Sequence, residues 1–288
     1  MTPTLTPADL ALSSPPVSRY PLFERLQPFA EAGFSAIALQ PGDVLMLEAQ
    51  GMAASEIAAR IADAGLTIAE LDCTACWMDH QTRVDQVGGL TEFLRRLTPE
   101  LVVGAAARVG AQSVTAIDLS VQPASLDEAA ESFARLCRMA AEHGMKAQIE
   151  FLPTGGIRSL REAMAIVEAA GCDNGGVTLD AWHFFRSGST LEELAKVPGH
   201  RIHAVQLCDA PAAPAADLWS ELMTARLLPG EGDLDVVGLV GTLDAIGCTA
   251  PTGVEVFHTR QDTMTLAEIA RDWAQSTNAL LARARSAA

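Results

Sequence analysis

The sequence predicts an α/β protein, a (β/α)8 barrel formed by a single domain over residues 1–288. Short apolar runs alternate with longer amphipathic ones, a pattern that is typical of parallel βα units. Eight strand-like runs and about eight helices follow one another without a change of composition that would mark a domain boundary. The length also suits one barrel of roughly 250 residues. A doubly wound sheet is the alternative, but the first βα turn lacks a GxGxxG phosphate loop.

Each expected strand is a short run rich in apolar residues, bounded by glycine or by polar residues. The expected strands cover residues 9–14, 35–39, 67–71, 113–117, 146–151, 176–180, 201–207 and 252–256. The sixth begins at Gly176 and ends in Asp180, and we expect the chain to continue into a loop that carries His183.

Amphipathic runs between these strands predict the helices. The expected helices cover residues 21–32, 53–64, 90–110 with a break near Pro99, 125–144, 159–170, 191–196, 234–246 and 266–285. The clearest one starts at Ser125, because Ser125 and Glu128 resemble a capping box and Gly144 ends the run. Two polar stretches, 72–89 and 209–233, carry little expected regular structure. The first is long enough to form a lid or rim over a site.

Composition excludes several classes of partner. The net charge of −16 argues against nucleic acid and anionic membranes, because phosphate groups are bound by clustered Lys and Arg. No run reaches the roughly 18 apolar residues that span a bilayer, and the N-terminus lacks the features of a signal peptide. We therefore expect a cytoplasmic protein whose six cysteines are reduced thiols. The sequence leaves the oligomeric state open, and a homo-oligomer is compatible with it.

Four expected strands carry an oxygen-bearing side chain at or near their carboxyl ends. These residues are Glu150, Asp180, Gln206 and Glu255. Because side chains alternate along a strand, the apolar neighbours of each residue face the helices and the polar side chain faces the barrel interior. Active sites of such barrels lie at the carboxyl ends of the strands. The pattern therefore predicts a site at this end of the barrel.

Three carboxylates at one place would repel one another and would be unfavourable to bury without a cation. Together with the amide oxygen of Gln206 they form an all-oxygen set, which favours Mg²⁺ or Mn²⁺ over Zn²⁺. The sequence thus predicts one divalent metal ion per chain. The alternative is that each side chain is satisfied separately by a Lys, an Arg or a backbone N–H group.

Five stretches of the second half resemble the xylose-isomerase-like TIM barrels. This sugar phosphate isomerase/epimerase superfamily includes D-tagatose 3-epimerase, hydroxypyruvate isomerase and 3-dehydroshikimate dehydratase. The stretches are 149–153 (IEFLP), 179–183 (LDAWH), 205–211 (VQLCDAP), 226–232 (RLLPGEG) and 254–256 (VEV). The first half matches only in the rhythm of its strands. The set of motifs is specific for the superfamily and not for one reaction.

The resemblance implies roles for particular residues. Glu150, Asp180, Gln206 and Glu255 match the metal ligands of the superfamily. His183 matches a histidine that contacts substrate oxygens beside the metal, and Arg226 matches an arginine that binds substrate.

Two departures bear on the reaction that the resemblance implies. Many members have a histidine at the position of Gln206, whereas some dehydroshikimate dehydratases resemble this chain in having Gln there, followed by Asp-Ala-Pro. The arginine that those dehydratases have at the end of the third strand is missing, and this chain offers Glu70, Asp72 and Trp77 in that region.

These observations predict a metal-dependent sugar isomerase or epimerase that acts on a small polyhydroxylated ketone through an enediolate. The metal would act as a Lewis acid, and Glu150 or Glu255 would remove the proton from the acidified C–H group. His183 would donate to the developing oxyanion or to a leaving hydroxyl group. The alternative is a metal-dependent dehydratase of the 3-dehydroshikimate type. An endonuclease-like repair protein and a non-catalytic sugar-binding barrel fit less well, the first because the chain is acidic.

Overall fold

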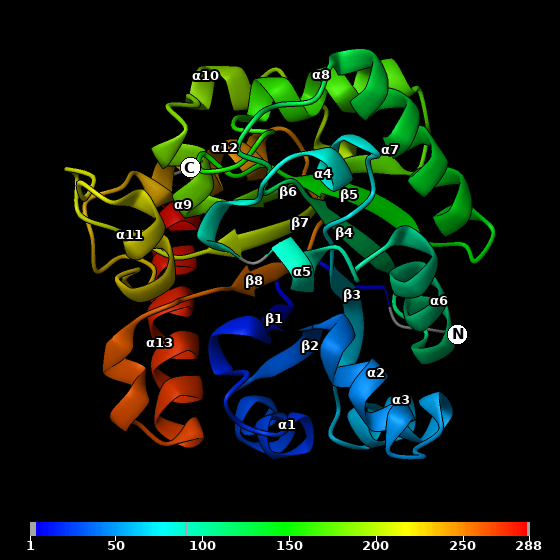
Figure 1. The fold of residues 1–288 in the computed structure, drawn as a ribbon. Coiled ribbons are helices and arrows are strands. Elements are labelled where there is room, and N and C mark those ends of the chain that lie inside the picture. Colours follow the sequence, from blue (N-terminus) through cyan, green and yellow to red (C-terminus); the bar gives the residue numbers. More distant parts are fainter. Residues whose placement is uncertain (1–3, 90, 287–288) are drawn as a thin grey trace.

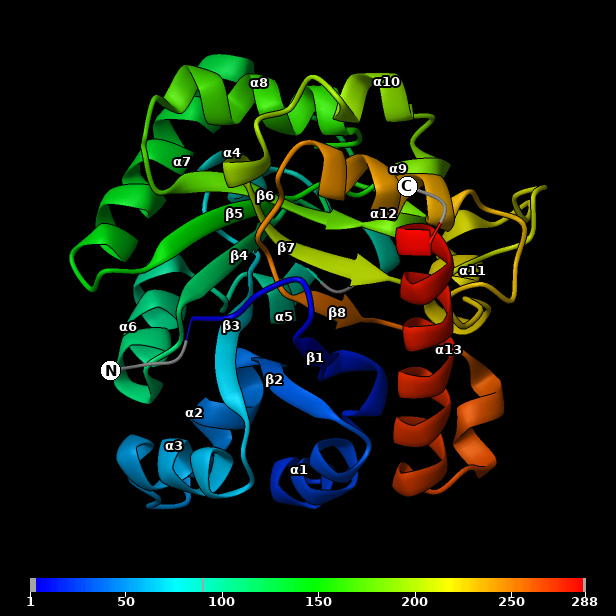
Figure 2. The same cartoon turned by 180° about the vertical axis from the view of Figure 1, so that it is seen from behind.

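Eight parallel strands close into a barrel in the order of the sequence, and helices surround it (Figures 1 and 2). The structure is a computed structural model that describes residues 4–89 and 91–286. Each strand pairs with its neighbour in the chain, and β1 pairs with β8 to close the barrel. The predicted (β/α)8 barrel is confirmed. No described helix is both long enough and apolar enough to cross a bilayer.

All eight predicted strands are present. They are β1 (Leu10–Ser13), β2 (Phe34–Leu39), β3 (Thr67–Thr74), β4 (Ser113–Ile117), β5 (Lys146–Glu150), β6 (Gly175–Asp180), β7 (Ile202–Leu207) and β8 (Thr252–Val254). Most strand ends agree with the prediction to within one residue, and two differ by more. β3 continues to Thr74, because Thr74 still pairs with Ala116 of β4 after a shift in register. β8 stops at Val254, so that Glu255 follows the strand directly.

The helices include the predicted ones and several that the sequence pattern missed. The α-helices are α1 (Leu22–Glu31), α2 (Pro41–Ala49), α3 (Ala54–Asp63), α4 (His80–Arg83), α5 (Thr91–Leu94), α6 (Pro99–Val109), α7 (Leu126–Ala141), α8 (Leu160–Ala170), α9 (Ala181–Arg186), α10 (Leu191–Leu194), α11 (Leu218–Thr224), α12 (Val236–Ala245) and α13 (Leu266–Ser286). Short 3-10 turns lie at Pro15–Val17 (η1), Val87–Gly89 (η2), Gly199–Arg201 (η3) and Thr259–Thr263 (η4).

Local capping explains how the helices compare with the prediction. The break expected near Pro99 in the helix over 90–110 is confirmed: α5 and α6 are separate, since Thr98 accepts a hydrogen bond from the N–H group of Leu101 and Pro99 occupies the first helical position. Residue 90, where that prediction began, lies outside the described residues. The loop expected to carry His183 is wrong, because the Asp180 side chain caps the short helix α9, which contains His183. The polar stretch 209–233 contains α11, capped by Asp217.

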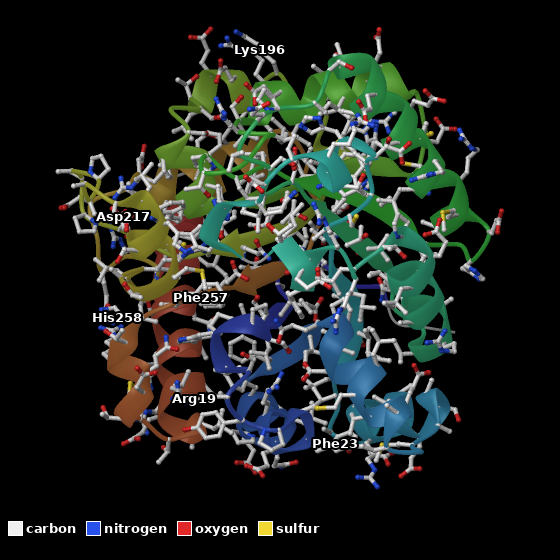
Figure 3. The ribbon with its side chains drawn as sticks, in the orientation of Figure 1. Arg19, Phe23, Lys196, Asp217, Phe257 and His258 are labelled. Carbon is white, nitrogen blue, oxygen red and sulfur yellow. The ribbon has the colours of Figure 1, made fainter. Side chains whose placement is uncertain are left out.

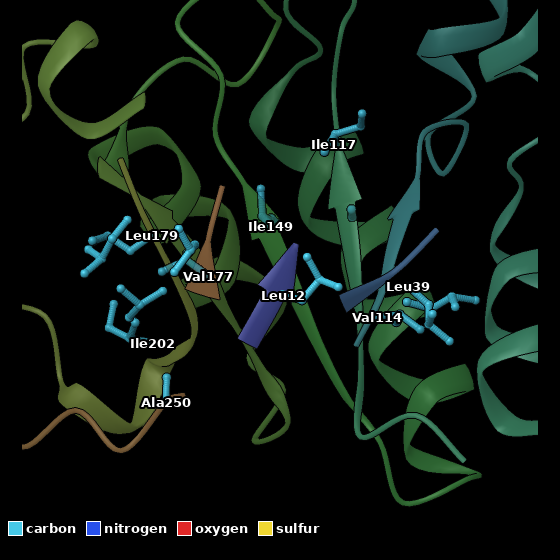
Figure 4. Packing of buried hydrophobic residues seen from close by; sticks show 14 of the residues in the cluster. Leu12, Leu39, Val114, Ile117, Ile149, Val177, Leu179, Ile202 and Ala250 are labelled. Carbon is cyan, nitrogen blue, oxygen red and sulfur yellow. The ribbon is translucent and has the colours of Figure 1, made fainter. Parts of the chain in front are cut away.

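The alternation of side chains along the strands divides the core into two layers. Leu12, Ile149, Val177 and Leu179 are fully buried between the barrel and the helices (Figure 4). The barrel interior is different, because the Gln148 side chain donates to Glu70 of β3 and to Ser113 and Thr115 of β4. Small and polar residues therefore fill the inside of this barrel, where bulky aliphatic residues are more usual.

A buried ion pair joins α1 to α2. The Arg25 guanidinium on α1 donates to both carboxylate oxygens of Asp43 at 2.8 and 3.0 Å, and Asp43 lies in the first turn of α2. The same guanidinium donates to the carbonyl oxygen of Tyr20 at 2.7 Å. Both charged side chains are buried. α2 was not predicted, although Pro41 in its first turn is a favourable helix start.

We expect Asp43→Ala to lower the free energy of unfolding by about 3–5 kcal/mol, because it leaves the buried Arg25 charge without a partner. Glu56→Ala is the matched control, since Glu56 pairs with Arg60 on an exposed helix face and should change stability by less than about 1 kcal/mol. Urea unfolding followed by circular dichroism measures both. Equal effects of the two substitutions would contradict the role assigned to the buried pair.

Candidate active site

The carboxyl ends of β5 to β8 bring the predicted site residues to one end of the barrel. Glu150 is the last residue of β5 and Asp180 is the last residue of β6. In the sheet, Asp180 is directly opposite Gln206 of β7, and Glu255 follows β8. All four side chains are buried.

Asp180 and His183 are joined by the start of α9. The Asp180 side chain accepts a hydrogen bond of 2.8 Å from the N–H group of His183 through Oδ1. This cap turns the His183 ring toward Glu150, and His183 Nε2 lies 3.5 Å from Glu150 Oε1. His183 Nδ1 has no hydrogen-bond partner in the part of the chain that the structure describes. A helix cap thus replaces the expected loop as the device that positions the imidazole.

Arg226 links the carboxylates to one another. Its Nη1 atom lies 2.7 Å from Asp180 Oδ2 and 3.2 Å from Glu255 Oε2. Its Nη2 atom lies 3.4 Å from His183 Nε2. The side chain is only 1% exposed, so that Arg226 is a central cation of the cluster and not a surface residue.

Aromatic rings and a backbone pairing hold this arginine in place. The guanidinium carbon lies 5.5 Å from the centre of the Trp182 ring and 5.4 Å from that of Phe257, which favours a cation at this position. The Arg226 N–H group donates to the carbonyl oxygen of Phe257, and Ala225 pairs with His258 in an isolated bridge. Figure 3 labels Phe257 and His258 beside α11.

Ser13 and Asp72 are site residues that the sequence reasoning did not assign. The Ser13 hydroxyl at the end of β1 donates to Glu255 Oε1 at 2.7 Å. Asp72 of β3 is buried, and its Oδ1 atom has no hydrogen-bond partner among the described residues. Both residues could have been predicted from the sequence, because each is polar, faces the barrel interior and lies near the end of a strand.

Burial sets the charge of the titratable groups. It raises the pKa of Glu150 well above its usual value, and repulsion by Asp72, Glu255 and Asp180 adds to the effect. Burial likewise raises the pKa of Glu255 to about 7, against the opposing effect of Arg226. The pKa of His183 is lowered to about 3 by burial, so that the imidazole is neutral near pH 7. The cluster therefore holds more acidic groups than Arg226 alone can keep ionised.

The donor set fits a divalent cation. Glu150, Asp180 and His183 each offer a ligand atom, and these atoms lie within 4.8 Å of one another. Neither amide atom of Gln206 has a hydrogen-bond partner among the residues described, although the side chain is buried. Buried polar atoms without partners call for a ligand or water. A neutral imidazole next to carboxylates is also compatible with Zn²⁺, which the all-oxygen set of the sequence prediction disfavoured.

Two long connections meet above this end of the barrel. Glu221 of α11 accepts hydrogen bonds from Trp182 Nε1 at 2.9 Å and from Arg186 Nε at 2.7 Å, and so attaches α11 to α9. Trp219 of α11 reaches the connection that follows β3, since a Cβ atom added to Gly88 would lie 2.6 Å from the indole. The stretches 72–89 and 209–233 are thus in contact, and a lid or rim formed by the first remains a prediction.

Comparison with known proteins identifies the fold and a family. A family model described as xylose isomerase-like TIM barrel matches residues 26–280. The chain is 28% identical over 182 residues to an inosose isomerase of Bacillus velezensis. The matched region covers 61% of this chain and 64% of the relative. The chain is 27% identical over 241 residues to a 3-dehydroshikimate dehydratase of Pseudomonas aeruginosa, covering 82% of this chain and 36% of the relative. The chain thus spans less than two thirds of these curated relatives.

Solved structures show the same fold at low sequence identity. A crystal structure of the IOLI protein with a bound zinc atom has a TM-score of 0.81 at 19% identity, with 96% of this chain and 98% of that chain covered. A structure of L-ribulose 3-epimerase has a TM-score of 0.70 at 18% identity, with 97% and 96% covered. At these identities the likeness concerns the fold alone.

We expect Glu221→Ala to loosen the segment 211–225, because the Arg186 guanidinium and the Trp182 indole would both lose their buried acceptor. Breaking a buried pair in this way should lower the local opening free energy by about 3 kcal/mol. Limited proteolysis within this segment should then be roughly a hundredfold faster. Glu192→Ala on α10 removes a carboxylate that is exposed and should leave the cleavage rate unchanged. Equal cleavage of both variants would show that Glu221 does not anchor α11.

Proposed function

We propose that this chain, which belongs to the xylose isomerase-like TIM barrel family, is a divalent-metal-dependent isomerase or epimerase of a small polyhydroxylated ketone. The observation that supports this most directly is the buried cluster of carboxylates, a neutral imidazole and one arginine at the carboxyl end of the barrel. Relatives named as an inosose isomerase and an L-ribulose 3-epimerase support the reaction class. The net charge of −16 supports a small-molecule substrate and not a nucleic acid.

In this proposal Glu150, Asp180, Gln206 and Glu255 hold the metal ion, and His183 lies beside it. Mn²⁺ and Mg²⁺ suit the oxygen donors, whereas Zn²⁺ would suit a set that includes His183. When bound, such a metal supplies Lewis-acid polarisation of a substrate carbonyl, which acidifies the neighbouring C–H group.

The side chains of the cluster would then move the proton. A carboxylate oxygen of Glu150 or Glu255 takes the proton from the C–H group, and the electron pair moves to the carbonyl oxygen to give an enediolate. Glu255, whose pKa burial raises to about 7, is suited to take and return a proton near neutral pH. Return of the proton to the neighbouring carbon isomerises the sugar, and return to the opposite face of the same carbon epimerises it.

Arg226 and His183 would stabilise the negative charge that develops on the substrate oxygens. The Arg226 guanidinium is fixed between Asp180 and Glu255, so that its remaining N–H groups are oriented before the substrate binds. His183 is neutral at pH 7, and the single N–H group of its ring can donate a hydrogen bond to a substrate oxygen. Both residues therefore bind and orient the substrate in this proposal.

The second candidate is a metal-dependent dehydratase of the 3-dehydroshikimate type. It shares the first proton transfer, after which the electron pair of the enediolate expels a β-hydroxyl group. That group leaves as water with the proton that Glu150 or Glu255 took from the C–H group, and the neutral His183 ring donates a hydrogen bond to the leaving oxygen. The match to the 3-dehydroshikimate dehydratase, which covers 82% of this chain, favours this candidate. Gln206 and the Asp-Ala-Pro sequence that follows Cys208 favour it as well.

Metal binding should stabilise the folded protein. We expect Mn²⁺, Mg²⁺ or Zn²⁺ at 100 times its Kd to raise the free energy of unfolding by about 2.7 kcal/mol. Glu150→Gln should remove most of this gain, whereas Glu192→Gln, at an exposed carboxylate, should retain it. Thermal unfolding with and without chelator measures the effect. No stabilisation by any of the three ions would contradict the proposed metal site.

Proton transfer distinguishes the two candidate reactions. With inosose-like and pentulose ketones in D₂O, an isomerase or epimerase should replace the transferred C–H proton by deuterium without new ultraviolet absorbance. With 3-dehydroshikimate, a dehydratase should instead produce the absorbance of a conjugated product.

Glu255→Gln should lower kcat/KM by about 100- to 10,000-fold, which is the usual contribution of a general base. Turnover that survives complete removal of metal would overturn the mechanism.

A further inference from the structure

A second feature of the barrel lies at the opposite end from the carboxylate cluster. A cavity of about 440 Å³ opens at the amino ends of the strands. Its rim includes His143 and Lys146, which lie where α7 leads into β5, and Pro251, which precedes β8. Its lining continues inward to Ser13, Glu70 and Gln206. The cavity therefore reaches the residues that lie directly beneath the candidate metal site.

The cavity exists because the inward-facing residues at this end are small. Ala11 of β1 is opposite Gly253 of β8 on one side and Ala36 of β2 on the other. One inward position further along, Ser13 is opposite Ala38. Bulky branched residues usually fill these layers in barrels of this architecture. Alanine and glycine at these positions leave a hollow that continues from the amino-terminal face into the barrel.

The residues at the carboxyl end of the barrel are covered. Asp180, His183 and Arg226 are each no more than 2% exposed. The two connections that follow β3 and β7 are in contact above them through Gly88 and Trp219. At the amino end, the cavity leads from the rim at Lys146 and Pro251 to Ser13 and Gln206.

The inner wall of the cavity is polar enough to hold water. Ser13 donates to Glu255, and the Glu70 carboxylate accepts from Thr115 and Gln148. Gln206, whose amide atoms have no partner among the described residues, contributes to the same wall. Polar cavities whose walls offer several hydrogen-bond partners hold ordered water, whereas genuinely empty cavities are apolar.

We propose that this cavity is a water-binding shaft that connects solvent at the amino-terminal face with Ser13, Glu70 and Gln206 on the underside of the active site. The ligand is water, which can both donate to the Glu70 carboxylate of the inner wall and accept from the Lys146 ammonium at the rim. The shaft hydrates the polar residues beneath the cluster while the residues at the carboxyl end are covered. It rests on the proposed function only in the assignment of the cluster above it as the active site.

Reaction of a thiol placed inside the shaft tests the proposal. In the full chain carrying Ala38→Cys, we expect methyl methanethiosulfonate to modify position 38 about tenfold or more faster than the packed native Cys137, which reacts only through local opening. Adding Ala11→Leu should narrow the shaft below position 38 and slow the reaction there by a similar factor. Because this second comparison concerns the same thiol, it does not depend on differences in thiol ionisation. Peptide mass spectrometry measures each site separately.

Native Cys208 reports on access from the other end, because its sulfur lies 3.7 Å from Arg226 Nη1 in the cluster. Modification of Cys208 as fast as position 38 would show that the reagent arrives through the carboxyl end, and would overturn the proposal. So would an unchanged rate at position 38 after Ala11→Leu, in a variant whose melting temperature shows an intact fold. Labelling requires neither metal nor substrate. A labelling result that contradicts the shaft would therefore leave the isomerase assignment untouched, and loss of the isomerase assignment would leave the labelling result untouched.

Discussion

The candidate active site depends on how one buried guanidinium compensates several buried carboxylates. Arg226 contacts Asp180 and Glu255 directly, and its second nitrogen lies 3.4 Å from the His183 ring. Removal of these charges from water is strongly unfavourable unless they are paired. The pKa of Glu150 is nevertheless raised well above its usual value, by burial and by its acidic neighbours. The cluster is thus arranged so that a further positive charge would be favourable, which is the physical basis of the metal proposal.

Much of this arrangement could be predicted from the sequence, because it follows from strand parity. The alternation of apolar and polar residues along β5 to β7 is enough to place Glu150, Asp180 and Gln206 inside the barrel. Parity does not give distances between residues far apart in the chain. The contact of Ser13 with Glu255 joins residues 242 positions apart, and only the closure of β1 onto β8 brings them together. Short helices were missed for a local reason, since α9 and α11 are too brief to show a helical period and depend on their capping aspartates.

The family relationship and the structure constrain the chemistry to different degrees. An inosose isomerase and a 3-dehydroshikimate dehydratase both occur among the relatives, so that membership of the family leaves the type of reaction open. In the two proposed mechanisms the outcome depends on whether the proton returns to carbon or goes to a leaving hydroxyl group. His183, whose orientation is set by the Asp180 cap, lies next to Glu150 and would contact that group. A few side chains on a shared barrel would then decide the reaction.

The contact between Gly88 and Trp219 has a consequence for how this barrel could diversify. Gly88 adopts a positive φ of 70°, and any side chain there would overlap the indole of Trp219. An exchange of either connection alone, for example by grafting a loop from a relative, would break the fit with the other. A chimera that keeps this contact would have to take both connections from the same relative.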